Sequence, residues 1–268
     1  MTNGRVRIFS DLHLGHRASR ITRVEDLRPL IRGADTVIFN GDTWQELARP
    51  WREKSKEMLD ELRAIGASEN CEMLFLPGNH DPGWDGPGYL ELAQGRIVIT
   101  HGDALMLDSS PWKREIMFGR KVVEELWQNH PVAATDVDTR LHLAREIARR
   151  LPSKQFPQGR SLIARAWDAA TPPRRALKML DAWLYQGNHG AVFCECYFPQ
   201  TEALIVGHLH HAGSWLVRGR RIINTGTFVV PGTACWAELH QGFLSFGKIV
   251  PGTDSYQLGE RKGLWKFN

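Results

Sequence analysis

Short apolar runs rich in β-branched residues alternate with amphipathic stretches over the first hundred residues. The apolar runs, at residues 6–9, 36–39, 73–76 and 97–99, have the length and composition of buried strands. Two stretches between them, 23–32 and 51–65, have helical spacing, and the second places Met58, Leu59, Leu62 and Ile65 on one stripe. Gly66 follows that stripe and is a typical helix stop. The pattern predicts a strand-and-helix alternation from residue 5 to about residue 101.

The pattern changes from about residue 202 onward. An apolar run at 203–206 is followed by short alternating runs separated by glycine, at residues 214–217, 221–223, 234–239 and 243–249. Such runs are typical of antiparallel strands. Together the two halves predict an α/β fold in which a two-sheet β-sandwich is flanked by helices.

The segment between the halves, about residues 110–190, is predicted to form consecutive helices. Prolines punctuate it at positions 131, 152, 157, 172 and 173. A chain of 268 residues can bury a sizeable core. We therefore predict that residues 1–268 form a single domain with a helical lid insertion at about 110–190, rather than two independent domains.

Composition argues against several classes of protein. No charged segment followed by an apolar stretch opens the sequence, and no run of about 18 apolar residues occurs, so we expect neither secretion nor a membrane span. The expected location is the cytoplasm. Four cysteines, at 71, 194, 196 and 235, are too few and too scattered for a disulfide framework. Cys194 and Cys196 could pair at a metal or redox site, but such a pair without a second pair or a nearby histidine is more often a buried thiol.

Five segments that follow predicted strands carry Asp, Asn and His in a regular order. They are Asp11-Leu12-His13, Gly41-Asp42, Gly78-Asn79-His80-Asp81, Thr100-His101-Gly102-Asp103 and Gly207-His208-Leu209-His210-His211. Because each follows an apolar run, the strands would bring these side chains to loops along one edge of a sheet. Carboxylate and amide oxygens together with imidazole nitrogens suit first-row divalent metals better than Mg²⁺ or Ca²⁺. The segments therefore predict a two-metal site.

Turn formation explains part of the same pattern, since Gly, Asn and Asp are common after strands. It explains the glycines and the asparagine but not the histidines at the ends of apolar runs. In order and in residue type, the segments resemble the calcineurin-like metallophosphoesterase superfamily, whose motifs are D-x-H, GD, GNH(D), a single H and G-H-x-H. The matches run from residue 11 to residue 211 and so cover the catalytic core.

The resemblance implies a metallophosphoesterase fold, a metal-dependent phosphoric ester hydrolase and a role for each matched residue. Asp11, His13 and His210 would hold one metal, Asn79, His101 and His208 the other, and Asp42 would bridge both. A shared carboxylate offsets the repulsion between two cations, and a metal-bound hydroxide would attack phosphorus. The implied cofactors are two divalent ions, and the ligand set accepts manganese, iron or zinc.

His80 resembles the histidine of the family that acts without binding metal. It would donate to the phosphate or protonate the leaving oxygen, with Asp81 as its orienting carboxylate. An alternative of equal weight is that Asp81 caps the turn before Pro82. His16 and His211 flank the matched positions, and we expect them to be exposed loop residues or to contact the ligands from outside.

The second motif departs from the family pattern. Many relatives carry a further acidic residue shortly after Gly-Asp, whereas this chain reads Gly41-Asp42-Thr43-Trp44-Gln45-Glu46. Glu46 is a candidate for that role from one position later. The departure bears on substrate preference rather than on metal binding.

The basic character of the chain is concentrated in the insertion. Residues 112–178 contain 14 Lys and Arg against 7 Asp and Glu, a net charge of +7, whereas the whole chain carries +4. A basic amphipathic helical unit can contact anionic lipid, cover an anionic substrate or bind nucleic acid, and a solvated face packed on the core is the plain alternative. Because the insertion lies between His101 and His208, we expect it to be a lid. The candidate substrate-binding residues are Lys113, Arg114, Arg149 and Arg150.

A helical insertion after His101-Gly102-Asp103-Ala104-Leu105 resembles the UDP-diacylglucosamine pyrophosphohydrolase branch of the superfamily. That branch usually has arginine where this chain has His80. The leading hypothesis is a phosphoesterase acting on a phosphoester or pyrophosphate, with a lipid-linked or nucleotide-sugar substrate. A nuclease is the alternative enzyme, although the aromatic residues stand at the helical spacing of core residues. A non-catalytic scaffold is the third, and retention of every ligand argues against it.

Overall fold

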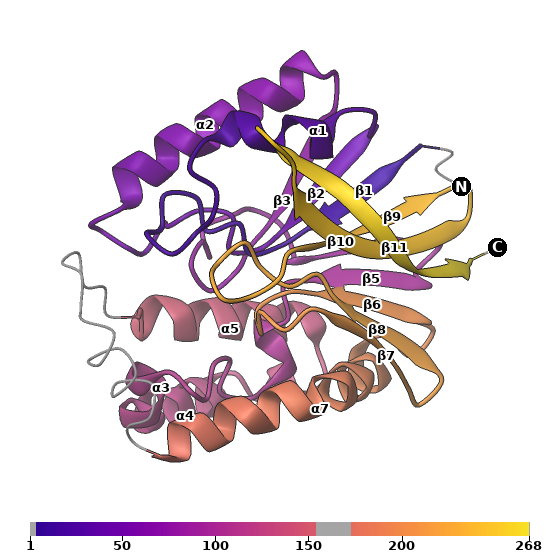
Figure 1. The fold of residues 1–268 in the computed structure, drawn as a ribbon. Helices are drawn as coiled ribbons and strands as arrows, with labels where there is room; N and C mark the ends of the chain where they lie inside the picture. The colour runs from indigo at the N-terminus through magenta and orange to yellow at the C-terminus, as the bar shows by residue number, and fades with distance from the viewer. Residues whose placement is uncertain (1–3, 154–172, 268) are drawn as a thin grey trace.

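The strands form two mixed sheets in the computed structural model, which describes residues 4–153 and 173–267 (Figure 1). The first sheet has the order β11-β10-β9-β1-β2-β3 and the second the order β4-β5-β6-β8-β7. The first contains β1 (Val6–Phe9), β2 (Thr36–Asn40), β3 (Glu72–Leu76), β9 (Cys235–His240), β10 (Phe243–Pro251) and β11 (Tyr256–Lys266). The second contains β4 (Tyr89–Leu92), β5 (Ile97–Thr100), β6 (Ala203–Val206), β7 (Gly213–Val217) and β8 (Arg220–Asn224). The predicted two-sheet α/β fold is confirmed.

The two sheets pack face to face through their apolar side chains. Val6 and Ile8 of β1 share one buried cluster with Ile97 and Ile99 of β5. Phe9, the next residue of β1, belongs instead to the cluster on the outer face of the first sheet. This alternation follows from the two-residue period of a strand, so that one strand supplies apolar side chains to both faces of the sheet.

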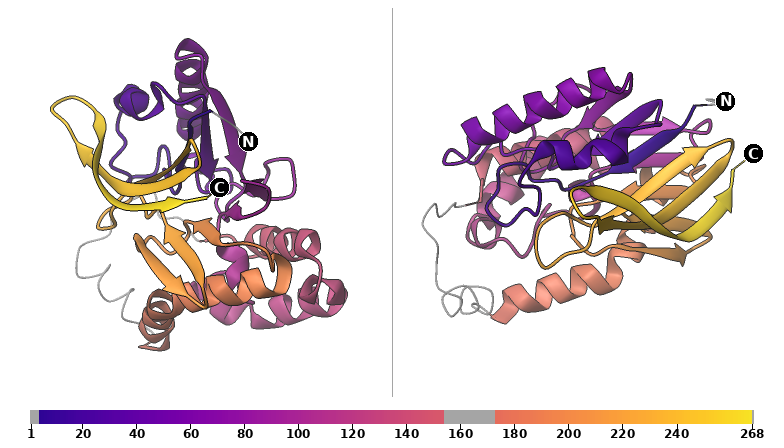
Figure 2. Two further views of the ribbon diagram at one scale, coloured as in Figure 1. Left: turned by 90° about the vertical axis from the view of Figure 1, so that its right-hand side faces the viewer. Right: turned by 45° about the horizontal axis from the view of Figure 1, so that its top comes forward.

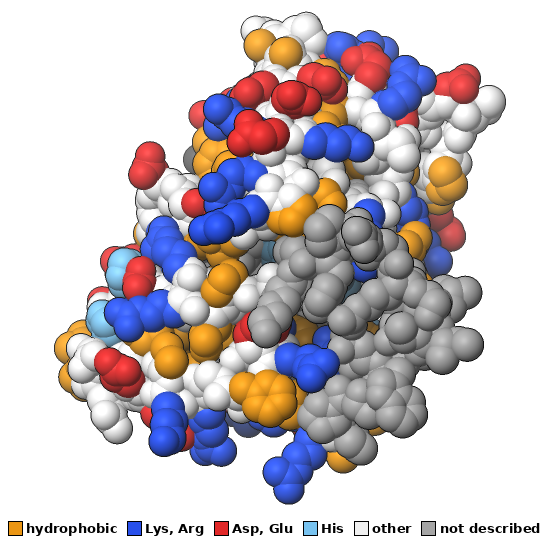
Figure 3. Space-filling view, turned by 90° about the vertical axis from the view of Figure 1, so that its left-hand side faces the viewer, with side chains coloured by type: hydrophobic (Ala, Val, Ile, Leu, Met, Phe, Trp, Pro, Cys, Tyr) orange, Lys and Arg blue, Asp and Glu red, His pale blue; other side chains and the backbone are white. Residues whose placement is uncertain are grey.

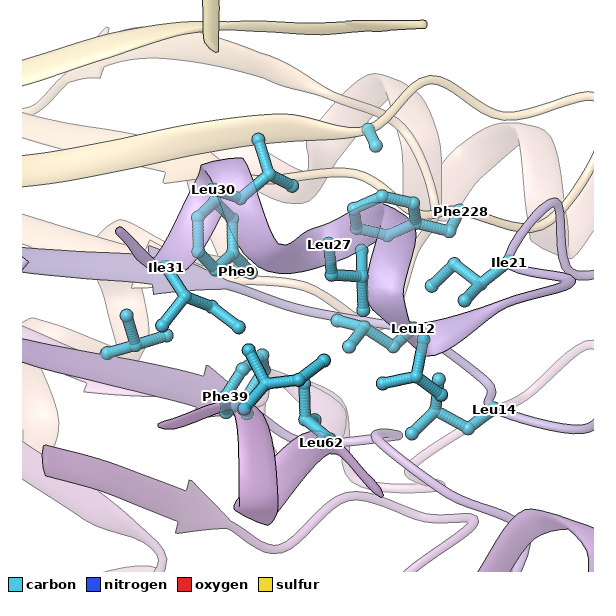
Figure 4. Close-up of a cluster of buried hydrophobic side chains, with 14 of the residues drawn as sticks. Phe9, Leu12, Leu14, Ile21, Leu27, Leu30, Ile31, Phe39, Leu62 and Phe228 are labelled. Atoms are coloured by element: carbon cyan, nitrogen blue, oxygen red, sulfur yellow. The ribbon is translucent and has the colours of Figure 1, made fainter. Parts of the chain in front are cut away.

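Helices cover the outer face of each sheet (Figure 2). The first sheet is covered by the short helices η1 (Val24–Leu27) and α1 (Arg28–Ile31) and by α2 (Arg52–Ser68). Figure 4 shows the side chains that fill this layer, among them Phe9, Phe39 and Phe228. The predicted helices at 23–32 and 51–65 are confirmed, and the apolar stripe of the second supplies Leu59 and Leu62 to this core.

The predicted end of α2 at Gly66 is wrong, because the helix continues to Ser68. Gly66 is buried against β3, and a Cβ built on it would lie 2.5 Å from Cε of Met73. Close packing therefore explains this glycine. The left-handed residue after the helix is Asn70, with φ of 54°, which is the residue type that tolerates this conformation after glycine.

The C-terminal strands differ from the prediction in one respect. β7 pairs antiparallel with β8, and β9 and β10 are antiparallel as expected, but β8 lies parallel to β6. Alternation of apolar and polar residues predicts that a strand exists. It does not predict the neighbouring strand, because pairing depends on the packing of the whole sheet. β4 and β11 are further strands that the sequence pattern did not predict.

The insertion contains α3 (Arg114–Phe118), α4 (Arg120–Asn129), η3 (Pro131–Ala134), α5 (Val137–Arg150) and α7 (Pro173–Tyr197). Its prolines lie at boundaries: Pro131 begins η3, Pro152 follows α5 and Pro173 begins α7, whereas 157 and 172 are outside the described residues. α5 and α7 also cover the second sheet, because Leu141 and Phe193 share a buried cluster with Leu204. The helices predicted at 110–190 are therefore packed on the sandwich as well as placed beside the loops that follow β5 and β6.

Arg140 fastens α5 to the loop that follows β5. Its side chain is 3% exposed, and Nη2 donates to the carbonyls of Ala104 (2.5 Å) and Met106 (2.7 Å). Its guanidinium lies 4.7 Å from the ring centroid of Trp127. The two hydrogen bonds of Nη2 fix the helix relative to the strand end that carries His101, although Nη1 is buried without a hydrogen-bond partner among the described residues.

Candidate metal centre

Five strands deliver the residues of the five sequence motifs to one edge of the sandwich. β1 leads to Asp11 and His13, β2 to Asp42, β3 to Asn79 and His80, β5 to His101, and β6 to His208 and His210. Five of these residues have a left-handed backbone, with φ of 52° at Asp11, 48° at His13, 50° at Asp42, 64° at His208 and 55° at His210. Non-glycine residues adopt this conformation at a cost and gather in functional sites.

One group of ligand atoms lies beside Oδ2 of Asp42. Atoms of Asp11, His13, Asp42 and His210 all lie within 4.8 Å of one another. Nε2 of His210 is 3.0 Å from Oδ1 of Asp11, and Nε2 of His13 is 3.6 Å from Oδ2 of Asp42. Two carboxylates and two imidazoles are a donor set that suits manganese, iron or zinc.

A second group lies beside the other carboxylate oxygen of Asp42. Nε2 of His101 is 3.5 Å from Oδ1 of Asp42 and is buried without a hydrogen-bond partner among the described residues. The other ring nitrogen of His101, Nδ1, lies 3.0 Å from the carbonyl of Asn40, to which it donates. That bond leaves Nε2 as a lone pair directed at Asp42, which is the form a metal requires.

His208 and Asn79 complete the second group. Nε2 of His208 donates to the carbonyl of Ser109 (3.1 Å), so Nδ1 carries the lone pair. Nδ1 lies 2.7 Å from the terminal amide group of Asn79, whose NH₂ group donates to it while the amide oxygen accepts from Nζ of Lys113 at 2.9 Å. Rotation of this amide by half a turn would place its oxygen beside the Nδ1 lone pair, and both atoms are donors that a divalent metal accepts. The residues therefore fit a second divalent metal, and the fit comes from the donor atoms themselves.

The electrostatics of the cluster favour neutral imidazoles at His13 and His208 and a positive charge beside the Asp42 carboxylate. Burial alone would raise the pKa of Asp42, but His101, His80 and His13 hold it well below its usual range. Burial lowers the pKa of His13 and of His208 well below the usual value. Burial would also lower the pKa of His101, but the Asp42 carboxylate raises it well above that value. A positive charge is thus favoured beside Asp42, where a proton on His101 and a metal would compete.

His80 lies beside the first group without joining it. Nε2 of His80 is 4.0 Å from Oδ2 of Asp42, and its ring is edge-on to that of His13 with centroids 4.8 Å apart. Burial lowers the pKa of His80 to about 3, so its imidazole is neutral near pH 7. A neutral imidazole can still donate one hydrogen bond to a bound group.

The carboxylate of Asp81 organises the backbone instead of the His80 ring. Its two oxygens accept from the backbone N–H groups of Gly78 (2.9 Å), Asp42 (2.9 Å), Thr43 (2.8 Å) and Trp44 (3.3 Å) and from Nε1 of Trp84 (3.1 Å). Burial and the Asp42 carboxylate raise the pKa of Asp81, while the Trp84 and Thr43 donors oppose that rise. Because donors occupy both oxygens, no acceptor remains for a carboxyl proton, and we assign Asp81 as a carboxylate. The turn-capping alternative is thus the one that these contacts favour.

Gln45 contacts His80 where an acidic residue was expected. Gln45 is fully buried, and its Oε1 lies 3.1 Å from Nδ1 of His80 while its Nε2 lies 2.9 Å from Nδ1 of His13. The carboxylate of Glu46, the candidate for the acidic residue of the family, accepts instead from the backbone N–H of Gly83 (2.7 Å). No motif in the sequence distinguished Gln45 from its neighbours, and the signal was only its position after Gly41-Asp42.

The four basic candidates of the insertion lie in different surroundings. Nζ of Lys113 is 2.9 Å from the terminal amide group of Asn79, so it reaches the second group, and burial lowers its pKa. Arg149 donates to the carbonyl of Pro82 (2.8 Å) and pairs with Glu146. Arg114 is the first residue of α3, and Arg150 faces Glu146 at 3.9 Å. The structure therefore brings Lys113 into the cluster, whereas Arg149 and Arg150 both face Glu146.

The two flanking histidines lie at the margin as well. His16 packs edge-on against Trp51, with centroids 4.8 Å apart, and burial lowers its pKa to about 4. His211 is exposed and lies between the rings of Trp183 and Trp215, at 5.5 and 6.1 Å. Neither ring belongs to the groups of ligand atoms described above.

Comparison with known proteins gives a family match and distant structural neighbours. The calcineurin-like phosphoesterase family matches residues 4–212. A dimetal phosphatase from Danio rerio is 13% identical with a TM-score of 0.50, and the alignment covers 99% of each chain. The E. coli phosphoesterase Yfce is 13% identical with a TM-score of 0.45, covering 98% of this chain and 100% of that one. Vps29 from Entamoeba histolytica, solved with Zn²⁺, is 13% identical with a TM-score of 0.43, covering 98% and 99%.

No curated protein sequence matches the chain. At 13% identity the Danio rerio structure supports the shared fold and nothing finer.

Proposed function

The chain belongs to the calcineurin-like phosphoesterase family, and from this premise we propose that it is a dinuclear metal-dependent hydrolase of a phosphoester or pyrophosphate. The proposed ligands are those of the two groups around Asp42, and the proposed cofactors are two divalent ions, manganese, iron or zinc. The proposed location is the cytoplasm. Among the described residues, no helix is long and apolar enough to cross a membrane.

The observation that carries the proposal is the position of Asp42 between two sets of donor atoms. Its Oδ2 faces Nε2 of His13 at 3.6 Å, and its Oδ1 faces Nε2 of His101 at 3.5 Å. A carboxylate whose two oxygens serve separate sets of ligands is suited to bridge two cations. A single-metal site would not need the second set.

The side chains around the cluster can take separate parts in phosphoester hydrolysis. When bound, the metals would act as Lewis acids and would activate a water molecule for attack on phosphorus. His80 has 18% of its side chain exposed, against 4% for His13, so a bound phosphoryl or leaving-group oxygen can reach it. Its neutral ring would donate a hydrogen bond to that oxygen. Asp81 holds the loops that carry Asp42 and Asn79 in place.

Lys113 is the residue of the insertion that we propose binds substrate directly. Its ammonium lies next to Asn79, and the Asp42 and Asp103 carboxylates oppose the effect of burial on its pKa. A cation at this position would attract a phosphate as it approaches the metals. Arg149 holds α5 against the loop after Asp81 and would act on substrate only through that loop.

The preferred substrate class is a larger phosphoester, lipid-linked or nucleotide-sugar, as in the UDP-diacylglucosamine pyrophosphohydrolase branch. Support comes from the place of the insertion over the strand ends and from its surface. Large apolar side chains are exposed there: Phe118, Leu177, Leu180 and Leu184. Figure 3 shows Lys and Arg side chains interspersed with hydrophobic ones on this side of the molecule. We propose that this mixed surface also makes peripheral contact with anionic lipid.

The test of the function is a substrate panel with the metal-loaded protein. It should include a monoester, a diester, a nucleotide-sugar pyrophosphate and single-stranded DNA, each before and after chelation. Metal-dependent hydrolysis of one of the first three would support the proposal. Selective cleavage of DNA would favour the nuclease, and no hydrolysis of any substrate would favour a scaffold.

Lys113→Met tests the substrate contact, with Lys121→Met on the exposed face of α4 as its control. Loss of a charged hydrogen bond to phosphate should lower kcat/KM by about 10- to 100-fold. The control should hydrolyse the same substrate at the parent rate. Equal kinetics for Lys113→Met and the parent would show that Lys113 does not bind substrate.

A further inference from the structure

Gln45 is held rigidly between two histidines of the centre. Its backbone N–H donates to Oγ of Ser55 at 2.8 Å, and the Ser55 hydroxyl donates to the carbonyl of Leu14 at 2.6 Å. Both Gln45 and Ser55 are fully buried. Since Ser55 belongs to α2, the loop after β2 is fixed to a long helix. The side chain of Gln45 therefore has a defined position beside His13 and His80.

The two rings present the same pair of nitrogens to the same two neighbours. Each ring turns Nδ1 toward Gln45, at 2.9 Å for His13 and 3.1 Å for His80. Each turns Nε2 toward Oδ2 of Asp42, at 3.6 and 4.0 Å respectively. When the proton of either ring moves from one nitrogen to the other, the hydrogen bond to Gln45 and the group presented to Asp42 therefore both change.

A carboxamide has one donor end and one acceptor end, and a neutral imidazole carries one proton. The ring that faces Oε1 must therefore carry its proton on Nδ1, and the ring that faces the NH₂ group must present an Nδ1 lone pair. His13 and His80 consequently hold opposite tautomers. In the structure Oε1 faces His80, so His80 has Nδ1–H and His13 has Nε2–H.

A cation at His13 would require the other arrangement, because a ligand nitrogen must be unprotonated. With Nε2 of His13 as the ligand, the proton of that ring stands on Nδ1 and needs an acceptor. Rotation of the amide by half a turn supplies Oε1 to His13 and the NH₂ group to His80, at the same two distances. His80 then loses the proton from Nδ1 and carries one on Nε2, the nitrogen on the Asp42 side.

We propose that Gln45 couples metal occupancy at His13 to the tautomer of His80, an inference that rests on the proposed function. Each ring moves its proton between its own two nitrogens by exchange with water, so no proton is gained or lost overall. The loaded site would present His80 Nε2–H toward bound phosphate, and the metal-free site would not. Gln45 is in this sense a positioning residue that makes His80 a donor when the site is loaded.

A carboxylate in place of Gln45 would break the coupling. Glutamate of nearly the same shape accepts from both rings, so His13 and His80 would both keep Nδ1–H. Metal binding at His13 would remain favourable, because the Nδ1–H of a ligand histidine commonly donates to a carboxylate. His80 would stay in the wrong tautomer. The Gln45→Glu variant thus separates the coupling from metal affinity.

The experiment is histidine ¹⁵N NMR of the full chain with and without Zn²⁺, with His80 resonances assigned by comparison with His80→Asn. We expect Zn²⁺ to exchange the protonated and unprotonated nitrogens of His80 in the parent and in Glu46→Gln, the control. In Gln45→Glu, His80 should keep Nδ1–H while Zn²⁺ still binds. Gln45→Met, which can neither donate nor accept, should weaken Zn²⁺ binding by about 10- to 100-fold.

Three results would overturn the proposal, and they are distinguishable. If Zn²⁺ shifts His13, His101 and His208 but leaves His80 in one tautomer, the metal site stands and the coupling is wrong. If Zn²⁺ shifts none of them, the metal site itself fails and the coupling fails with it. A switch of His80 in Gln45→Glu equal to that of the parent would also contradict the role of the amide.

Discussion

Replacing Asp81 with asparagine should destabilise the fold strongly without changing the size of the side chain. Five N–H groups donate to the two carboxylate oxygens: two of them to Oδ1, from Gly78 and Asp42, and the others to Oδ2. Asparagine keeps one acceptor oxygen and replaces the other with an NH₂ group. In either orientation at least two buried N–H groups lose their acceptor, and at about 1–3 kcal/mol each the loss is about 2–6 kcal/mol.

The assay is urea unfolding of metal-free protein at pH 7, with the free energy of unfolding taken from the midpoints at a common slope. Metal must be absent, because ligand binding would add its own stabilisation. Asp136→Asn is the matched control. Asp136 caps α5 by accepting from the N–H of Thr139 (2.8 Å), and asparagine caps helices equally well, so the change should be within about 0.5 kcal/mol.

The reasoning would be refuted by an Asp81→Asn variant that unfolds at the urea concentration of the parent. If such a variant also lost turnover while keeping its metals, Asp81 would act on His80, as the alternative reading of Gly78-Asn79-His80-Asp81 supposes. If Asp81→Asn lowers the free energy of unfolding and the control Asp136→Asn does not, Asp81 is established as the residue that fixes the second and third motifs relative to each other.

Three further predictions follow from the site and from the surface. Asp42→Ala should lose bound metal and activity together, because the two oxygens of Asp42 face the two groups of ligands; elemental analysis showing two metals per chain in this variant would count against the bridge. His80→Ala should keep its metals and lose about 10²- to 10⁴-fold in turnover, less for a nitrophenyl ester than for an alkyl ester; an equal loss for both would indicate phosphate positioning instead of leaving-group donation. Hydrogen bonds from Arg32 and Arg28 lower the pKa of Glu69 to about 2, so its contribution to stability is present above about pH 4.5 and is lost as the pH falls toward 2. Glu69→Gln should therefore unfold more readily than the parent at pH 7, with the difference vanishing near pH 2; a difference independent of pH would show that the charge is not involved.

Much of the fold could be predicted from the sequence because the spacing of apolar residues depends only on the local strand or helix. The apolar run of β2 is continuous because both faces of this strand are buried, which distinguishes it from the alternating strands near the C-terminus. The partner of β8 was not predictable in the same way. Whether Ile222 and Ile223 pair with β7 alone or also with β6 depends on the whole sheet, and β8 lies parallel to β6.

The ligand residues could be proposed from the sequence because the strands end at one edge of the sandwich. Residues that are far apart in the sequence are therefore close together in space. The sequence did not predict which side chains contact the ligand residues. Gln45 differs from Glu46 in function only because the turn after Asp42 directs one side chain inward to His80 and the other toward Gly83. Lys113 is one of many basic residues of the insertion, and its approach to Asn79 depends on how the helices pack.

The most direct test of the account is to locate the metals. Crystals grown or soaked with Mn²⁺ should give two anomalous scattering peaks about 3.5–4 Å apart. One peak should be bound by Asp11, His13 and His210, the other by Asn79, His101 and His208, with Asp42 touching both. Two such peaks would establish the dinuclear centre. A single peak, or peaks elsewhere on the chain, would contradict it.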